Sequence, residues 1–191
     1  MACGTVSRRI VATAITGLIT PTIARVIHPH QYAIGRPAGA EEMHKLTQIL
    51  LERQHNAILS ADVKSAFSDL HLDKLTHAIQ QHCPEYEPLV RPWITANASY
   101  LCKLNDDEDL HLTSSRGVPM GCPMAAAAFA LTLHTALDEA HNELATRYPD
   151  ITINAYMGDI NIITTDNSVD DVLRCLTSKL AAIGFTLNDT K

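Results

Sequence analysis

Hydrophobic positions recur with different periods along this 191-residue chain, and the changes of period divide it into elements. Residues 6–27 and 124–147 are rich in Ala, Leu and Ile and predict two long helices, the first buried and kinked near Pro21. The segment EEMHKLTQILLER (41–53) has the period of an amphipathic helix. Helices are also expected over 72–81, 85–97 and 168–184, the last with Ser168 as N-cap and Gly184 as C-cap.

Short apolar runs between these helices predict the strands. NAILSADV (56–63) suits a buried strand that ends in an acid, and FTLND (185–189) suits a last strand. SYLCKL (99–104) and DLHLT (109–113) predict one hairpin, and ITINAYM (151–157) and INIITT (160–165) predict another. HPHQYAIGRPAGAE (28–41), with two prolines and two glycines, is expected to be a loop. This order predicts an α+β fold, with an antiparallel sheet covered by helices on one face.

The composition indicates a globular chain, and its charged residues are distributed unevenly along the sequence. Apolar residues make up 46% and charged residues 19%, which excludes a disordered chain. The net charge is −6, yet residues 1–40 hold four arginines and no acid, while the remainder holds 11 basic and 21 acidic residues. A basic segment on an acidic body suits contact with phosphates at one end, although ordinary surface scatter explains it equally.

Cysteine and apolar segments bear on the compartment. The five cysteines include no C-x-x-C pair and the ten histidines show no ligand spacing, so we expect neither a disulfide framework nor a zinc site. Residues 10–27 carry several threonines, Pro21 and Arg25, which makes a poor membrane span, and they do not resemble a signal peptide. An intracellular location, the nucleus included, and no membrane partner are expected.

Two carboxylates are placed to form a site. Asp62 ends the strand AILSAD, and Asp159 lies at the tip of the second hairpin. If folding brings both to one end of the sheet, they form a hard-oxygen site that suits Mg²⁺. Aspartates also commonly end strands and occupy turns, so this spacing alone leaves a structural role open.

Several segments carry a resemblance that sharpens this picture. ILSADVKSAF (58–67), SSRGVPMGCPMAAAAFAL (114–131), NAYMGDINII (154–163) and GFTLNDTK (184–191) resemble the palm motifs of reverse transcriptases in order and spacing. They are most similar to the non-LTR retrotransposon type, including trypanosomatid elements. ACGTVSRRIVATAI (2–15) and HPHQYAIGRPAGAE resemble segments that precede the palm. The resemblance implies one reverse transcriptase-like domain over 1–191, with partial fingers (1–56), a palm (57–191) and no thumb.

The resemblance also implies roles for particular residues. Asp62 and Asp159 would hold Mg²⁺, or Mn²⁺ in its place, and Lys191 would act as a charge or proton donor near the phosphates. The expected partners are an RNA template, a DNA primer and deoxynucleoside triphosphates. Nucleotide-binding and nucleic-acid-binding roles fall respectively on Val63, Phe67, Met120 and Gly121, and on Arg8, Arg9, Arg36 and Arg116. Phe67 would crowd a ribose 2′-hydroxyl, with core packing as its alternative role, and Lys191 has the alternative of a solvated side chain.

The sequence departs from the family pattern at its most sensitive point. The hairpin motif of the family is aromatic-x-Asp-Asp, whereas this chain reads Tyr156-Met157-Gly158-Asp159. Met120 stands where glutamine is usual, and AAAA (125–128) replaces a more varied segment. Losing one carboxylate of a two-metal site is expected to cost about 4 kcal/mol of transition-state stabilisation, roughly a thousandfold in rate.

Three functional hypotheses follow. The first is RNA-templated DNA synthesis by two-metal nucleotidyl transfer, impaired at Gly158. The second is a non-catalytic nucleic-acid-binding remnant of a retrotransposon polymerase, which relies on the basic segment 1–40. The third is a helical α+β domain that only packs against a partner, with its aspartates as turn residues.

Overall fold

The structure is a computed structural model that describes residues 6–52, 56–94, 98–105 and 108–188. Its principal elements are α1 (Val6–Val26), α2 (Gly39–Leu51), β1 (Asn56–Asp62), α3 (Leu72–His82), α4 (Glu87–Val90), β2 (Ala98–Asn105), β3 (Glu108–Ser114), α5 (Ala125–Ala145), β4 (Thr152–Tyr156), β5 (Asp159–Thr165) and α6 (Val169–Ala182). Short 3-10 turns cover Pro84–Tyr86, Arg91–Trp93 and Asp166–Ser168.

The central sheet is antiparallel, with the strand order β1-β5-β4. Because side chains alternate along a strand, the register separates two faces. One face is apolar: it carries Ala61 of β1, Ile160 and Ile162 of β5, and Ile153 and Ala155 of β4, and the last four are fully buried. The sheet therefore presents one continuous apolar surface to the helices.

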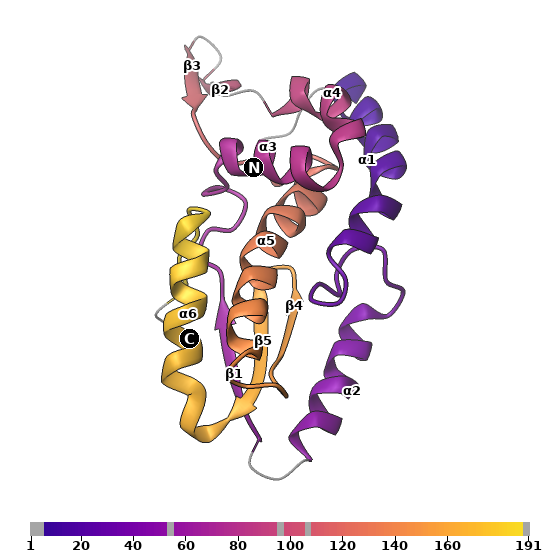
Figure 1. Cartoon of the computed structure of the whole chain (residues 1–191). Helices are drawn as coiled ribbons and strands as arrows, with labels where there is room; N and C mark the ends of the chain where they lie inside the picture. The colour runs from indigo at the N-terminus through magenta and orange to yellow at the C-terminus, as the bar shows by residue number, and fades with distance from the viewer. Residues whose placement is uncertain (1–5, 53–55, 95–97, 106–107, 189–191) are drawn as a thin grey trace.

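Helices α5 and α6 supply the core that meets this surface (Figure 1). Twelve residues of α5 are buried, so this helix is surrounded by protein along most of its length. Its partner α6 is amphipathic and buries Val172, Cys175, Leu176 and Leu180. The α+β class predicted from the sequence is confirmed.

The second face of the sheet is polar at one end and covered at the other. Ser60 and Asp62 of β1, Asn161 of β5 and Tyr156 of β4 belong to it, as the register shows. Helix α2 contacts all three strands, and Asn154 on this face is 2% exposed. We infer that α2 covers the end of this face that lies away from Asp62. The sequence predicted helices on one face only, so α2 is a difference from that prediction. The end with Asp62 stays accessible.

Two short segments flank the accessible end of the sheet. Tyr32 donates its N–H to the carbonyl of Ala155 (2.8 Å), and the Ala155 N–H donates to the carbonyl of His30 (2.6 Å), so residues 30–32 line the outer edge of β4. Opposite, Lys64 donates to Thr186 (2.8 Å) and Asn188 donates to the Asp62 carbonyl (2.8 Å). The last strand predicted over 185–189 is thus reduced to a short pairing.

Helix α1 is exposed more than expected. It buries Ala12, Ile15, Ile19 and Ile23 along one stripe, whereas Ile10 and Leu18 are mostly exposed. By length and composition α1 is apolar enough to cross a membrane, and 22% of its most apolar stretch is buried in the structure. The prediction of a buried helix was wrong, because the rest of the described chain covers only one side of α1 and leaves apolar residues on its other side exposed.

Other local predictions divide in a similar way. In place of the helix expected over 85–97, the structure has α4 and two 3-10 turns, because Pro88 and Pro92 inside this range lack the N–H that a continuous helix needs. Ser168 stands at the predicted N-cap position of α6, but its hydroxyl makes no capping hydrogen bond and donates to the Thr165 carbonyl instead (2.7 Å). Gly184 ends α6 as predicted: its φ is +87°, and Phe185 N–H reaches back to the Leu180 carbonyl.

Candidate active site

Asp62 and Asp159 are directly opposite each other in the register of β1 and β5. The Val63 N–H donates to the Gly158 carbonyl at 3.0 Å, so the neighbouring pair Asp62–Asp159 is of the non-hydrogen-bonded kind. In such pairs the Cα atoms are about 4.5 Å apart and side chains on one face lie closest. The structure brings together the two carboxylates that the sequence left far apart.

Asn188 holds Asp62 from the flank of the sheet. Its side-chain amide donates to Oδ2 of Asp62 at 3.3 Å, and its backbone N–H donates to the Asp62 carbonyl. Asp62 is half-buried, whereas Asp159 is exposed. The sequence analysis did not assign Asn188 a role, although it lies in the motif GFTLNDTK.

The two-residue turn between β4 and β5 contains a strained residue close to these carboxylates. Met157 has φ 54°, in the left-handed region that non-glycine residues rarely adopt. Type II′ turns need this φ at their first central position, where glycine is favoured. The glycine of this turn, Gly158, stands at the second position and lies outside the positive-φ range. The turn therefore does not require glycine at 158.

Space for a side chain exists at Gly158. A Cβ there would lie 3.5 Å from Cβ of Val63 and 3.8 Å from Cζ of Phe129, which are ordinary van der Waals contacts. Steric crowding at the Cβ position therefore does not explain why glycine stands here in place of aspartate. In the described part of the chain, no group of three or more His, Cys, Asp or Glu side chains is arranged to hold a metal.

A glutamine that the sequence analysis missed holds the same turn. The Met157 N–H donates to Oε1 of Gln31 (2.8 Å), and Nε2 of Gln31 donates to the Met157 carbonyl (3.2 Å). Gln31 is 1% exposed. A glutamine between histidines and prolines in a loop carries no periodic signal, so only the three-dimensional contact reveals it.

Phe67 lies beside this site on an aromatic row. Its ring is 5.5 Å from that of Phe129, which is in turn 5.3 Å from that of Phe185. Phe129 and Phe185 are fully buried, whereas Phe67 keeps part of its surface exposed. The core therefore fixes the orientation of Phe67 while part of the residue stays exposed to solvent.

The loop before α5 is docked onto the segment that follows β1. Gly117 has φ +82°, and a Cβ there would lie 2.5 Å from the carbonyl oxygen of Ser68. Its N–H donates to the Leu70 carbonyl at 2.8 Å. Gly117, next to Arg116, is thus the glycine that this close packing of two loops requires. The nucleotide-binding role of Gly121 stays a prediction. Gly121 itself is half-buried, in the turn that leads into α5.

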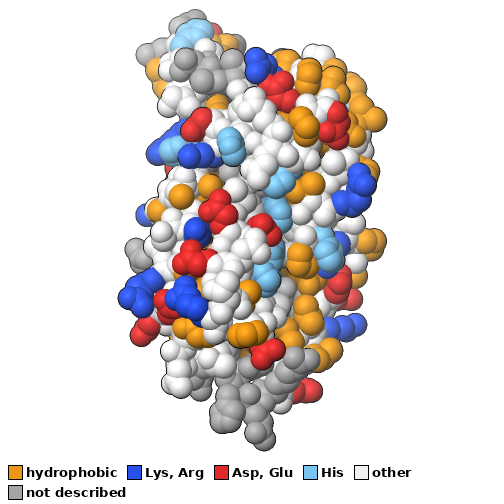
Figure 2. Space-filling model, viewed as in Figure 1, with side chains coloured by type: hydrophobic (Ala, Val, Ile, Leu, Met, Phe, Trp, Pro, Cys, Tyr) orange, Lys and Arg blue, Asp and Glu red, His pale blue; other side chains and the backbone are white. Residues whose placement is uncertain are grey.

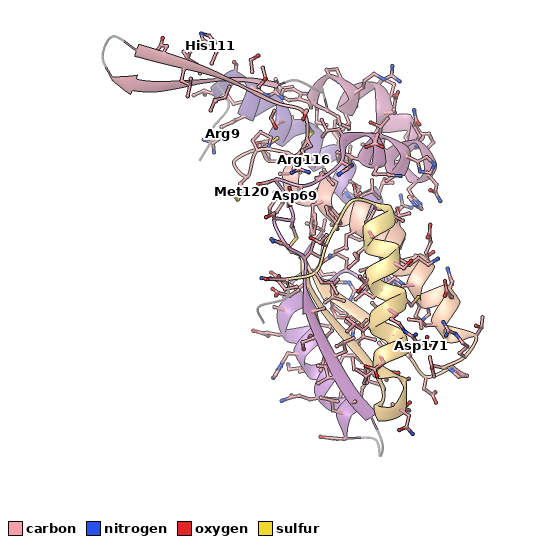
Figure 3. All side chains as sticks on the ribbon, turned by 90° about the vertical axis from the view of Figure 1, so that its left-hand side faces the viewer. Arg9, Asp69, His111, Arg116, Met120 and Asp171 are labelled. Atoms are coloured by element: carbon pink, nitrogen blue, oxygen red, sulfur yellow. The ribbon has the colours of Figure 1, made fainter. Side chains whose placement is uncertain are left out.

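Several predicted contact residues lie around the base of the β2–β3 hairpin. Figure 3 shows Arg9, Asp69, Arg116 and Met120 gathered there, with His111 on the projecting hairpin. Met120 is 63% exposed, and Arg116 forms an ion pair with Asp69 at 3.3 Å. These side chains remain accessible from solvent.

The predicted arginines differ in their surroundings. Arg36 lies 4.3 Å from the ring centre of Tyr32 and pairs with Glu42 at 3.1 Å. Arg8 lies 4.5 Å from the ring centre of Trp93, whereas Arg9 is exposed on α1. The positive charge of Arg36 is therefore already paired with Glu42 and stacked on Tyr32 within the chain. Lys191, the remaining predicted catalytic residue, lies outside the described residues.

A row of histidines lies apart from the carboxylates, and Figure 2 shows histidine side chains gathered along this face. Ring centres are 5.6 Å apart for His82 and His134, 6.0 Å for His134 and His30, and 5.1 Å for His30 and His141. Nδ1 of His134 and Nε2 of His82 are buried and lack hydrogen-bond partners within the described residues. Burial lowers the pKa of His30, of His82 and of His134, the last to about 4.

Comparison with known families agrees with this arrangement. The profile described as "Reverse transcriptase (RNA-dependent DNA polymerase)" matches residues 1–191. The chain therefore belongs to the reverse transcriptase family.

One curated relative is a transposon protein. The chain is 25% identical over 170 residues to the "Transposon TX1 uncharacterized 149 kDa protein" of Xenopus laevis. The match covers 83% of this chain and 13% of that protein, so the chain spans a small part of its relative.

Solved structures with the same fold include telomerases. A Candida tropicalis telomerase truncated from its C-terminal domain matches 94% of this chain and 39% of its own, with a TM-score of 0.68 and 13% identity. A Candida albicans telomerase with a fragment of telomeric RNA matches 96% of this chain and 33% of its own, with a TM-score of 0.55 and 13% identity. At this identity the likeness shows the fold alone.

Proposed function

We propose that this chain is the palm-containing part of an RNA-templated DNA polymerase whose nucleotidyl transfer is impaired. The observation that carries the proposal is the direct cross-strand pairing of Asp62 and Asp159 at the accessible end of the sheet. Family membership supplies the reaction class, and an RNA template, a DNA primer and deoxynucleoside triphosphates are the proposed substrates. Phe67 is proposed to line the sugar pocket.

The donor set fits a hard divalent cation. Two carboxylates on one face of neighbouring strands repel each other, and a cation between them relieves that repulsion. We assign Mg²⁺, or Mn²⁺ in its place, to Asp62 and Asp159, with Asn188 orienting Asp62 through its amide. A bound divalent ion in this family activates the primer hydroxyl and neutralises phosphate charge.

Gly158 is the proposed cause of the impairment. With two carboxylates instead of three, the site lacks an anionic ligand for a second ion. Because the fold leaves room for a Cβ at this position, restoring the carboxylate is a clean experiment.

Primer extension on an RNA template, with Mn²⁺ binding measured in parallel, tests the proposal. We expect Gly158→Asp to extend primers about a thousandfold faster than the natural chain, and Asp62→Asn in the Gly158→Asp background to remove that gain. Asp170→Asn on α6, an exposed carboxylate, is the matched control and should change neither measurement. Robust extension by the natural chain would refute impairment, and Mn²⁺ binding that survives Asp62→Asn would refute the site.

A non-catalytic nucleic-acid-binding remnant is the second candidate, and the exposure of Arg9 and Arg116 around one loop favours it. It predicts salt-dependent binding of single-stranded RNA without added divalent ions. Arg9→Ala should weaken binding and flatten its salt dependence, whereas Arg36→Ala, whose arginine already pairs with Glu42, should not. Equal effects of the two substitutions would remove the reason for this candidate.

Finer assignments belong to the same proposal. We propose a non-LTR retrotransposon polymerase, of the kind found in trypanosomatids, as the origin of the chain, in line with its likeness to a transposon protein. The division into fingers (1–56) and palm (57–191) is proposed on the motifs alone. An intracellular place of action, the nucleus included, is proposed on the cysteine pattern and the apolar segments of the sequence.

A further inference from the structure

We infer that Gln31 is a positioning residue that sets the β4–β5 turn, so that Asp159 faces Asp62. The inference deepens the proposed function, since the carboxylate pair is its site. Gln31 belongs to the loop between α1 and α2, far along the chain from the turn that it contacts.

The first support is the completeness of the contact. One primary amide receives the Met157 N–H at 2.8 Å and donates to the Met157 carbonyl at 3.2 Å. The same Oε1 also accepts the Ala33 N–H at 3.2 Å, which ties the amide to its own loop. The side chain thereby replaces the backbone partner that a neighbouring strand would give Met157.

The second support is that Met157 is the residue that needs holding. Its φ of 54° is unfavourable for a side chain with a Cβ, and strained residues persist only where their surroundings fix them. Asp159 begins β5 two residues later. A change in the turn conformation would therefore rotate Asp159 or shift its register against Asp62.

The third support is the anchoring of Gln31 itself. The backbone around it pairs with β4 through the bonds of Tyr32 and His30 to Ala155. Gln31 is 1% exposed, so water does not compete for its amide. The pairing of residues 30–32 with β4 thus fixes the position from which Gln31 reaches the turn.

The test compares Gln31→Met, which keeps the volume and removes both hydrogen-bonding groups, with Gln31→Glu, which keeps the acceptor for the Met157 N–H. Thr47→Val is the matched control, because Thr47 is 7% exposed and its hydroxyl bonds only within α2. The readouts are amide hydrogen exchange at Met157, the cross-strand Hα–Hα contact of Asp62 and Asp159 by NMR, and Mn²⁺ affinity.

We expect Gln31→Met to raise exchange at Met157 by about tenfold over the control, to weaken the Hα–Hα contact, and to lower Mn²⁺ affinity severalfold. Gln31→Glu should retain protection of the Met157 N–H. If Gln31→Met exchanges at Met157 no faster than Thr47→Val, the hydrogen bonds of Gln31 do not hold the turn. If it exchanges faster but keeps the Hα–Hα contact, Gln31 does not position Asp159. If the natural chain binds no Mn²⁺, the proposed metal site fails, while the first two readouts still decide the role of Gln31.

Discussion

Asp62 is the last residue of β1 and pairs directly with Asp159, the first residue of β5. The adjacent backbone bond from Val63 to Gly158 fixes that register. A slip by one residue would turn one carboxylate to the apolar face, so the register of this strand pair decides whether a cation site exists.

Restoring a carboxylate at position 158 should make stability depend on metal. We expect Gly158→Asp to fold, to lose about 1 kcal/mol through repulsion without a cation, and to regain it in millimolar Mg²⁺. Thermal melts with Mg²⁺ and with a chelator measure this, as a difference of about 2–4 °C. A melting temperature that Mg²⁺ leaves unchanged would contradict the prediction.

Truncating Phe67 should separate its two possible roles. Phe67→Ala should cost about 1–3 kcal/mol of stability, because the ring packs on Phe129. In the Gly158→Asp background it should also raise incorporation of ribonucleotides relative to deoxyribonucleotides by about tenfold or more. Lost stability with unchanged sugar selection would leave only the packing role.

Adding a methyl group at Gly117 should be severely destabilising. The Cβ would lie 2.5 Å from a backbone oxygen, and the φ of +82° is strained for alanine. We expect Gly117→Ala to lose about 2 kcal/mol or more. Chemical denaturation measures it, with Gly17→Ala in α1 as control, because the Cβ there meets nothing within 4 Å.

The buried histidines should make the protein sensitive to acid. The pKa of each of His30, His82 and His134 is lowered in the folded state from the ordinary histidine value of 6.5. Below about pH 6.5 the unfolded chain therefore binds protons more readily than the folded chain. Stability is therefore complete above about pH 6.5 and falls as the pH drops towards 4.

Asp138, whose Oδ1 is 3.9 Å from Nε2 of His30, partly opposes this shift. Denaturation curves between pH 7 and 4.5 check the slope, and His134→Phe should make it shallower. A slope unchanged by that substitution would place the acid sensitivity elsewhere.

The network between α5 and α6 should give a weaker, salt-dependent effect. Asp171 accepts hydrogen bonds from Arg147 and from the hydroxyl of Tyr148, and the bond from Arg147 lowers its pKa. Asp171→Asn should lower the melting temperature slightly in dilute buffer and less at high salt. Melts across salt concentrations measure the difference.

The sequence predicted what depends on local patterns and on short motifs. The order of most helices and strands and the C-cap at Gly184 follow from periodicity and turn chemistry, whereas the meeting of Asp62 and Asp159 was expected from the resemblance to the family's motifs. The helix expected over 85–97 was wrong, because Pro88 and Pro92 lie inside it and favour short turns over a continuous helix.

Contacts between distant segments could not be predicted. Gln31 and Asn188 act on the hairpin and on Asp62 across more than a hundred residues, through single side chains in irregular segments. The positive φ of Met157 likewise could not be predicted, because methionine carries no preference for that conformation. Such features depend on tertiary geometry that no local signal encodes.

The two flanking segments also bear on self-association. Unpaired strand edges recruit strands from other molecules, and here residues 30–32 and 186–188 occupy both edges at the carboxylate end. During synthesis the β1 side of that end stays unguarded until residues 186–188 have left the ribosome. A nascent chain is therefore expected to be most prone to aggregation just before its sheet is completed, and chaperones would find their target at that stage.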